Sequence, residues 1–266
     1  MSSEARTVGK VESLWRYPVK SMRGEELPEI FAGFSGVYGD RAFAFHDTAA
    51  HAGFPYFTGR EQARMLLYQP RYRHPERMSK PPNLSEAQSL GSGVTPLYAR
   101  ADECALDVES PDGELIAIDD PRLIQMLKDG TRDAHQLTLL RSERALTDCR
   151  PVSLLSMHTA RQIGQELGIS MDKRRFRANI YAELKSQEPF GENKFVGASL
   201  QIGAKARITV VGRDTRCKMI TLDPATGEAN PDVMRVVAQA YEGQVGVYAV
   251  VLAEGMIRTG DEIALL

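Results

Sequence analysis

Apolar and polar residues alternate with a period of two along the first half of the chain. The alternation runs from Val11 to Tyr17 and returns at 41–46, after three closely spaced glycines that mark turns. This period places apolar side chains on one face of an extended chain and therefore predicts two strands. The strand-like segments 105–108 and 114–118 flank the turn sequence Ser110-Pro111-Asp112-Gly113 and predict a hairpin.

The second half of the chain continues with short strands and few helices. Helices are predicted at 121–128, 157–167 and 231–241, the first two capped by Asp120 and Ser156. Strands are predicted at 136–140, 152–155, 178–184, 199–202, 206–211, 245–252 and 262–266. This mixture favours a mainly β fold with some α, built of two β-barrel-type domains, over a doubly wound sheet. The predicted domains are residues 1–119 and 120–266.

One stretch departs from this pattern. Residues 70–96 are rich in Pro, Ser, Gly and charged residues. Such a composition predicts a long surface loop.

Charge and cysteine content exclude several classes of protein. The 266 residues carry 33 basic and 35 acidic side chains, a formal net charge of −2, which argues against a nucleic-acid partner. Three cysteines form neither a disulfide framework nor a four-thiolate metal site. The start of the chain has no apolar signal segment, and the longest apolar run, 247–253, is too short to span a membrane. A cytoplasmic protein without membrane association is therefore expected, and we expect it to be a monomer.

Cys217 is the strongest candidate for chemistry. It follows a predicted strand and has Arg213, Arg216 and Lys218 close by in sequence. Cationic neighbours favour the thiolate, which is a soft metal ligand and a nucleophile. The alternative is a half-buried cysteine with a packing role, since free cysteines are usually buried.

Other candidate residues lie at the ends of predicted strands. Lys20, Ser21 and Arg41 are suited to an anionic ligand, although surface charge is the simpler explanation for any one of them. Arg177 and Asn179 share one face of a predicted strand. The helix start at 156–160 offers free amides to a phosphate. No Walker, Gly-x-Gly-x-x-Gly, Gly-x-Ser-x-Gly or His-Glu-x-x-His motif is present.

These motifs together resemble the MOSC-domain proteins, and in particular the amidoxime-reducing component and its bacterial relatives. The resemblance extends from about Val8 to Leu266 and rests on motifs that occur in the family's order. They are Tyr17-Pro18-Val19-Lys20-Ser21, Arg41, Phe176-Arg177-Ala178-Asn179, Arg216-Cys217 and Asp223-Pro224-Ala225-Thr226-Gly227. It implies a MOSC N-terminal β-barrel domain followed by the MOSC domain.

The resemblance also implies a molybdenum cofactor, a pterin dithiolene with a phosphate. Cys217 would be the catalytic residue and the protein thiolate on molybdenum. The implied cofactor-binding residues are Lys20, Ser21, Arg41, Thr58, Arg60, His158, Thr159, Arg177, Asn179, Thr215 and Arg216. Close family members carry an apolar residue and two threonines between the cysteine and Asp-Pro, whereas this chain has Lys218 and Ile220 there.

Two functions remain open at this point. One is a molybdenum-dependent reductase of N-hydroxylated small molecules, which would need a separate ferredoxin-type or flavin-type electron donor because this chain has too few cysteines for a ferredoxin domain. The alternative is a non-redox carrier of the cofactor, or of sulfur held as a Cys217 persulfide. A folded protein whose site has decayed is a third interpretation, disfavoured because Lys20, Arg41, Arg177, Asn179 and Cys217 are all present.

Overall fold

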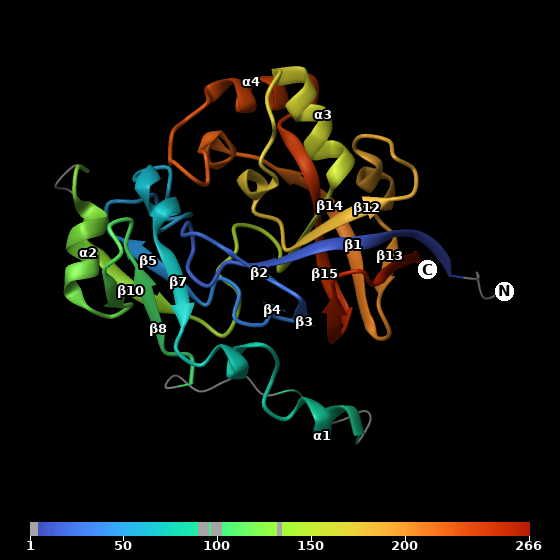
Figure 1. The fold of residues 1–266 in the computed structure, drawn as a ribbon, viewed down its shortest axis with the longest axis horizontal. Helices are drawn as coiled ribbons and strands as arrows, with labels where there is room; N and C mark the ends of the chain where they lie inside the picture. The colour runs from blue at the N-terminus through green and yellow to red at the C-terminus, as the bar shows by residue number, and fades with distance from the viewer. Residues whose placement is uncertain (1–4, 90–95, 97–102, 132–134) are drawn as a thin grey trace.

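The computed structural model describes residues 5–89, 96, 103–131 and 135–266. Within these residues the fold is mainly β with four α-helices, which confirms the predicted class (Figure 1). The strands are β1 (Arg6–Arg16), β2 (Glu25–Leu27), β3 (Glu29–Gly33), β4 (Gly36–Val37), β5 (Phe43–Asp47), β6 (Tyr56–Phe57), β7 (Gln69–Tyr72), β8 (Leu106–Glu109), β9 (Leu115–Ala117), β10 (Leu137–Arg141), β11 (Val152–Ser156), β12 (Ile180–Leu184), β13 (Ser199–Ile202), β14 (Ala206–Thr215), β15 (Gln244–Ala253), β16 (Gly255–Arg258) and β17 (Glu262–Leu265). The helices are α1 (Leu84–Ser89), α2 (Pro121–Lys128), α3 (Met157–Leu167) and α4 (Pro231–Ala240).

Seven strands close into a barrel. Their order is β1-β12-β11-β15-β14-β13-β17, and β17 pairs again with β1. All these pairs are antiparallel except β11 with β12. Closure leaves no strand edge for another chain to join. Alternate side chains fill the barrel interior, among them Val11, Leu154, Ile208 and Val247.

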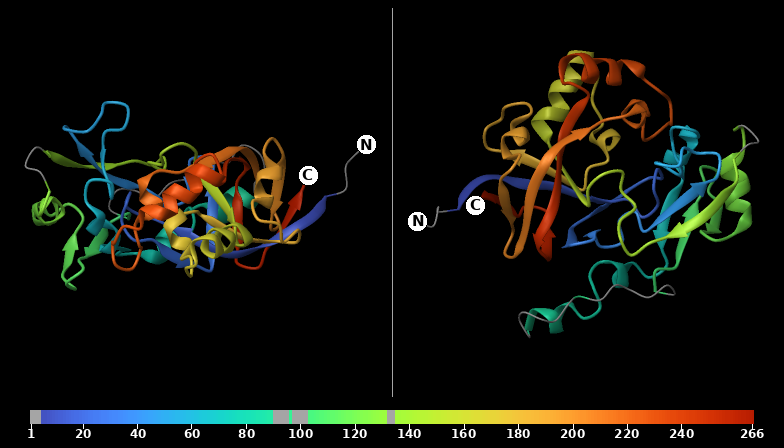
Figure 2. Two further views of the ribbon diagram at one scale, coloured as in Figure 1. Left: turned by 90° about the horizontal axis from the view of Figure 1, so that it is seen from above. Right: turned by 180° about the vertical axis from the view of Figure 1, so that it is seen from behind.

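The barrel takes one strand from the opposite end of the sequence. β1 lies between β12 and β17, so the N-terminal segment completes a barrel whose other six strands all come after residue 150. Strand β16 follows β15 in the sequence but lies outside the barrel, where it pairs with β3. The two ends of the chain therefore lie side by side at the barrel, where Arg6 pairs with Leu265 (Figures 1 and 2).

The remaining strands form three small sheets beside the barrel. Their orders are β10-β5-β6, β7-β8-β9 and β16-β3-β4. The first two share a second core with α2, which contains Phe45, Phe57, Val108 and Leu123 (Figure 1). The division at residue 120 stays a prediction, and the pairing of β1 with β12 shows that strands from both sides of it build the barrel.

The expectation of one long loop over residues 70–96 is wrong for part of that stretch. Residues 70–72 belong to β7, which pairs with β8, and α1 forms at Leu84–Ser89. Leu84 and Ala87 are buried one helical turn apart, which gives α1 an apolar face despite the prolines before it. Residues 90–95 lie outside the described part of the chain.

Helices α3 and α4 cover the barrel on one side (Figures 1 and 2). Both begin at the predicted positions, where Ser156 and Asn230 accept hydrogen bonds from the first turn. They pack on a third core that includes Trp15, Tyr17 and Phe176. Residues 14–19 thus contribute to all three cores, since Leu14 lies in the barrel core and Val19 in the second core.

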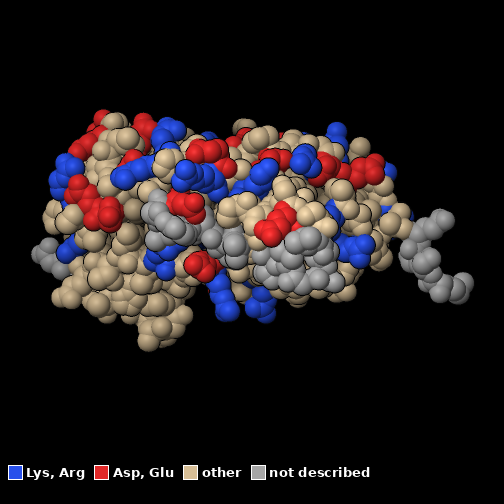
Figure 3. All heavy atoms as spheres, turned by 90° about the horizontal axis from the view of Figure 1, so that it is seen from below, with Lys and Arg blue, Asp and Glu red and all other residues tan. Residues whose placement is uncertain are grey.

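Basic and acidic side chains are interspersed on the face drawn in Figure 3, in keeping with the small net charge. Among the described residues, no helix has both the length and the apolar character needed to cross a bilayer.

The contact between β1 and β12 gives a test of the barrel closure. An alanine Cβ at Gly9 would lie 2.7 Å from the Glu183 carbonyl oxygen, which belongs to the partner strand and cannot retreat without breaking the pairing. We expect Gly9→Ala to lower the free energy of unfolding by about 1–3 kcal/mol, measured by urea denaturation. Gly212→Ala in β14 is the control, because a Cβ at that position would meet nothing within 4 Å. Equal stability of the two variants would contradict the close contact between Gly9 and Glu183.

Candidate functional site

A cavity with about 750 Å³ of empty space, open to solvent, lies where the barrel meets the second core. It brings together ten of the twelve residues predicted from sequence. They are Lys20, Ser21, Arg41, Thr58, Arg60, Arg177, Asn179, Thr215, Arg216 and Cys217.

Positive charge exceeds negative charge around this cavity. Its cationic side chains are Lys20, Arg41, Arg60, Arg150, Arg175, Arg177 and Arg216, and its acidic ones are Asp148 and Asp214. Buried cations are costly unless they are paired or meet an anion. The cavity therefore favours an anionic ligand.

Lys20 and Ser21 reach the cavity because the chain turns directly after β1. Lys20 is 6% exposed, and its Nζ donates to the Leu146 carbonyl at 2.8 Å and to the Asp148 carboxylate. Burial lowers the pKa of the Lys20 ammonium, and the Asp148 charge opposes that shift. Ser21 adopts a left-handed backbone with φ 66°. Because this region is uncommon for residues other than glycine, the surrounding structure must hold the turn in place.

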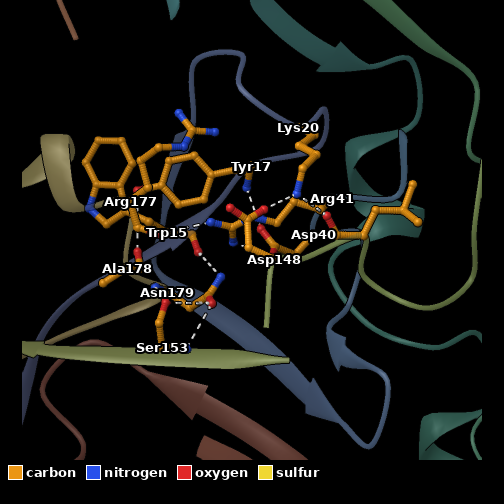
Figure 4. Close-up of polar contacts among 12 residues, drawn as sticks. Trp15, Tyr17, Lys20, Asp40, Arg41, Asp148, Ser153, Arg177, Ala178 and Asn179 are labelled. Carbon is orange, nitrogen blue, oxygen red and sulfur yellow. Dashed lines mark hydrogen bonds and ion pairs between the residues drawn. The ribbon is translucent and has the colours of Figure 1, made fainter. Parts of the chain in front are cut away.

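Arg41 is anchored by the residue before it. Its Nη1 donates to Asp40 at 2.6 Å, and its Nη2 donates to the Arg177 carbonyl at 3.0 Å. The other oxygen of Asp40 accepts the Tyr17 N–H at 2.7 Å. One buried carboxylate thus joins the end of β1 to the segment that carries Arg41 (Figure 4).

Arg177 lacks an acidic partner among the described residues. The Arg177 Nη2 is buried and has no hydrogen-bond acceptor among these residues. The Arg177 backbone is left-handed, with φ 52°. Burial lowers the pKa of Arg177 to about 10, and nearby Arg41 adds to the effect. Like Ser21 and Arg41 (φ 44°), Arg177 is a cavity residue with positive φ, and such strain is often found at functional sites.

Asn179 connects strands at the base of the cavity. Its Nδ2 donates to the Trp15 carbonyl at 3.3 Å, and its Oδ1 accepts the Ser153 N–H at 3.2 Å (Figure 4). It is 1% exposed. The side chain therefore ties β1 to β11 beside Arg177, and a contact with a ligand stays a prediction.

Arg216 also has a structural role. Its Nε and Nη1 each donate at 2.7 Å, to the carbonyls of Val245 and Phe176, and its Nη2 lies 2.8 Å from Asp214. These contacts hold the segment after β14 in place. Cys217 follows as a free, half-buried thiol on the cavity wall, beside Thr215.

The two residues that depart from the family pattern are Lys218, which makes its hydrogen bond to a group other than the thiol, and Ile220, which lines the same cavity as Cys217. Lys218 donates from Nζ to the Arg60 carbonyl at 3.0 Å, and Ile220 is 2% exposed in the third core. Lys218 therefore links the Cys217 segment to the loop that carries Thr58 and Arg60.

That loop is ordered by its own side chains. Thr58 Oγ1 donates to Glu61 at 2.7 Å and accepts the Arg60 N–H at 3.2 Å. The Arg60 guanidinium lies 4.3 Å from the centre of the Phe54 ring and 3.3 Å from Asp148. Arg60 thus reaches the cavity, while the Thr58 hydroxyl is engaged in the turn.

His158 and Thr159 do not line the cavity, contrary to the sequence-based expectation. His158 Nε2 lies 3.2 Å from Glu183, and Thr159 Oγ1 donates to the buried Glu192 at 2.8 Å. The side chains at the start of α3 therefore contact β12 and Glu192 and do not reach the cavity.

Several residues that line the cavity were not predicted from the sequence. Asp148 joins Lys20 and Arg60, and Arg175 donates to Asp223 at 2.6 Å. Asp148 lies in a segment with no motif or period, so only the fold reveals its position. Arg175 stands directly before Phe176-Arg177, where the run of basic residues was visible.

Sequence comparison assigns both halves of this cavity to known domains. A model of the MOSC domain matches residues 141–264, and a model of the MOSC N-terminal beta barrel domain matches residues 8–91. The chain is a MOSC-domain protein. The cavity draws Cys217 and Arg177 from the MOSC domain and Lys20 and Arg41 from the N-terminal domain.

Two known proteins are similar to this MOSC-domain protein. The molybdenum cofactor sulfurase of Drosophila willistoni is 27% identical over 135 residues, which is 50% of this chain and 16% of that protein. The chain therefore spans well under half of its relative's length. A crystal structure of the YuaD protein of Bacillus subtilis has a TM-score of 0.50 and 14% identity, covering 98% of this chain and 96% of that one. This likeness shows the fold alone.

The buried carboxyl beside α3 makes a pH-dependent prediction. Burial raises the pKa of Glu192 above its ordinary value, so the folded protein binds this proton more tightly than the unfolded chain. Unfolding free energy should therefore fall as pH rises above about 4.3, the ordinary pKa of Glu. Glu192→Gln should remove that loss and gain stability relative to the unmodified protein toward neutral pH.

Urea unfolding between pH 4 and 8 measures the difference. Exposed Glu188, in the same loop, provides the control variant Glu188→Gln. Parallel stability curves for Glu192→Gln and the unmodified protein would show that Glu192 ionises freely in the folded state.

Proposed function

We propose that this protein binds a molybdenum cofactor and reduces N-hydroxylated small molecules. The observation that carries the proposal is the combination of two groups in one cationic cavity. Cys217 provides a free thiol, and Arg177 provides a buried guanidinium that has no acidic partner among the described residues. The MOSC domain and the similarity to a molybdenum cofactor sulfurase support the choice of cofactor.

The residues present fit this group. A pterin dithiolene with a phosphate is anionic, and the cavity has cations in excess. Among the described residues, no three His, Cys, Asp or Glu side chains cluster as a metal site. A metal that arrives with its own sulfur ligands needs only one further thiolate from the protein, and Cys217 lines the cavity.

The residues around the cavity would have three roles: neutralising the charge of the cofactor, holding the cavity segments in place and binding the metal. Lys20, Arg41 and Arg177 would neutralise the anionic groups, with Ser21 and Arg60 at the same wall. Arg216, Asn179 and Thr58 hold the segments that carry them, as their hydrogen bonds indicate. Cys217 would be the metal ligand, with Thr215 beside it.

When bound, the cofactor supplies oxygen-atom transfer coupled to two electrons. The balanced reaction joins an N–OH compound, two electrons and two protons to give the N–H compound and water. A separate ferredoxin-type or flavin-type protein would supply the electrons. Arg and Lys side chains at the mouth would orient a polar N–OH group.

A carrier function is the second candidate, and the sulfurase relative favours it. In this case Cys217 would hold sulfur as a persulfide, or the cavity would hold the cofactor for delivery. Persulfide on Cys217 of the isolated protein, without turnover of an N-hydroxylated compound when a chemical reductant is added, would favour the carrier.

Metal content tests the main proposal. Protein purified from a host that makes the cofactor should contain molybdenum and pterin in near-equal amounts, and Cys217→Ala should lose most of the molybdenum. Cys149→Ala should keep it, because Cys149 is exposed and does not line the cavity. Elemental analysis and pterin fluorescence give the two amounts. Unmodified protein without molybdenum would overturn the proposal.

A further inference from the structure

Tyr17 lies against two guanidinium groups of the cavity. The Arg177 guanidinium carbon is 4.3 Å from the centre of the Tyr17 ring, and that of Arg41 is 4.6 Å from it (Figure 4). Both distances fall within the range of cation–π contacts. Tyr17 is 1% exposed and does not itself line the cavity.

The contact with the Tyr17 ring offsets the repulsion between the guanidinium groups of Arg41 and Arg177. Like charges this close repel, and burial strengthens the repulsion. Arg41 has the Asp40 carboxylate at 2.6 Å, whereas Arg177 has no acidic partner within the described residues. The negative face of the Tyr17 ring therefore favours a charged Arg177 before any ligand arrives.

Tyr17 is itself held at both ends. Its N–H donates to Asp40, its carbonyl accepts the Arg41 N–H at 2.7 Å, and its hydroxyl donates to the Ala178 carbonyl at 3.4 Å. Against the ring, a Cβ at Gly24 would come within 2.4 Å of a Tyr17 carbon, so this position has no room for a side chain. The ring is thus fixed between the segments that carry Arg41 and Arg177.

We propose that Tyr17 is a positioning residue, whose ring holds Arg41 and Arg177 together as a preformed pair that binds the phosphate or other oxyanion group of the ligand. This inference rests on the anionic ligand of the proposed function. The ring lowers the cost of keeping two cations adjacent in the empty cavity, so less binding energy is lost in arranging them. The hydroxyl of Tyr17 orients the ring and is not needed for the contact with the cations.

Binding of inorganic phosphate to cofactor-free full-length protein tests this inference by titration calorimetry. Tyr17→Leu should weaken phosphate binding about tenfold, which is about 1.4 kcal/mol, because leucine has no π-face. Tyr17→Phe should stay within about twofold of the unmodified protein. If Tyr17→Leu does not fold, Tyr17→Met provides a longer apolar side chain without a ring.

A control separates positioning from general destabilisation. Phe45→Leu truncates a fully buried ring of the second core and should lower the melting temperature without changing the dissociation constant. In an Arg177→Leu background, Tyr17→Leu should cost much less affinity than in the unmodified protein, since the two residues act through one contact.

The outcomes distinguish this inference from the proposed function. Tyr17→Leu with unchanged affinity, Tyr17→Phe as weak as Tyr17→Leu, or unmodified protein that binds no phosphate would each overturn the positioning role. If the purified protein carries no molybdenum but phosphate binding still depends on the Tyr17 ring, the proposed cofactor fails and the positioning role stands.

Discussion

The hydrogen bonds that β1 makes with β12 hold the two walls of the cavity against each other. Leu14 pairs with Ile180, and one step further the Trp15 N–H donates to the Asn179 carbonyl at 2.9 Å. After the end of β1 at Arg16 the chain leaves the barrel, and Val19 and Met22 pack in the second core. Barrel closure therefore brings the end of β1 beside Arg177, and loss of the hydrogen bonds between β1 and β12 would separate the two walls of the cavity.

Three of the cavity arginines differ in the partners of their guanidinium groups. Arg216 and Arg175 donate to backbone carbonyls and pair with Asp214 and Asp223, so they stabilise the loops around Cys217. Arg216 Nη2 and Arg177 Nη2 are both buried donors without a hydrogen bond in the described part of the chain, but Arg216 has Asp214 at 2.8 Å, whereas Arg177 has no acidic partner there. Desolvation of the Arg177 donor is a cost of folding that an incoming anion would recover. Arg216 and Arg175 thus give the site its shape, and Arg177 is the cation that an anionic ligand would contact.

Local sequence patterns predicted many of the helices and strands, but they did not predict which strands pair to close the barrel. Helix α3 and strand β13 have the predicted bounds, because a cap, a period and a turn are encoded within a few residues. The pairing of β1 with β17 joins residues some 250 positions apart, and no local signal encodes it. The same limit applies to the site. Resemblance to a family predicted Lys20 and Cys217, whereas Asp148 reaches the cavity only through the tertiary fold.

Lys218 shows how a departure from the family pattern is accommodated. The sequence places the cation of Lys218 next to the Cys217 thiol, and the structure directs its Nζ to the Arg60 carbonyl at 3.0 Å. The bond leaves the charge exposed and links the Cys217 segment to the loop of Arg60, whose guanidinium approaches Asp148. Met219 packs on the same loop, since a Cβ at Gly59 would lie 2.9 Å from its sulfur. Lys218 and Met219 therefore fix the Cys217 segment against the loop that carries Arg60.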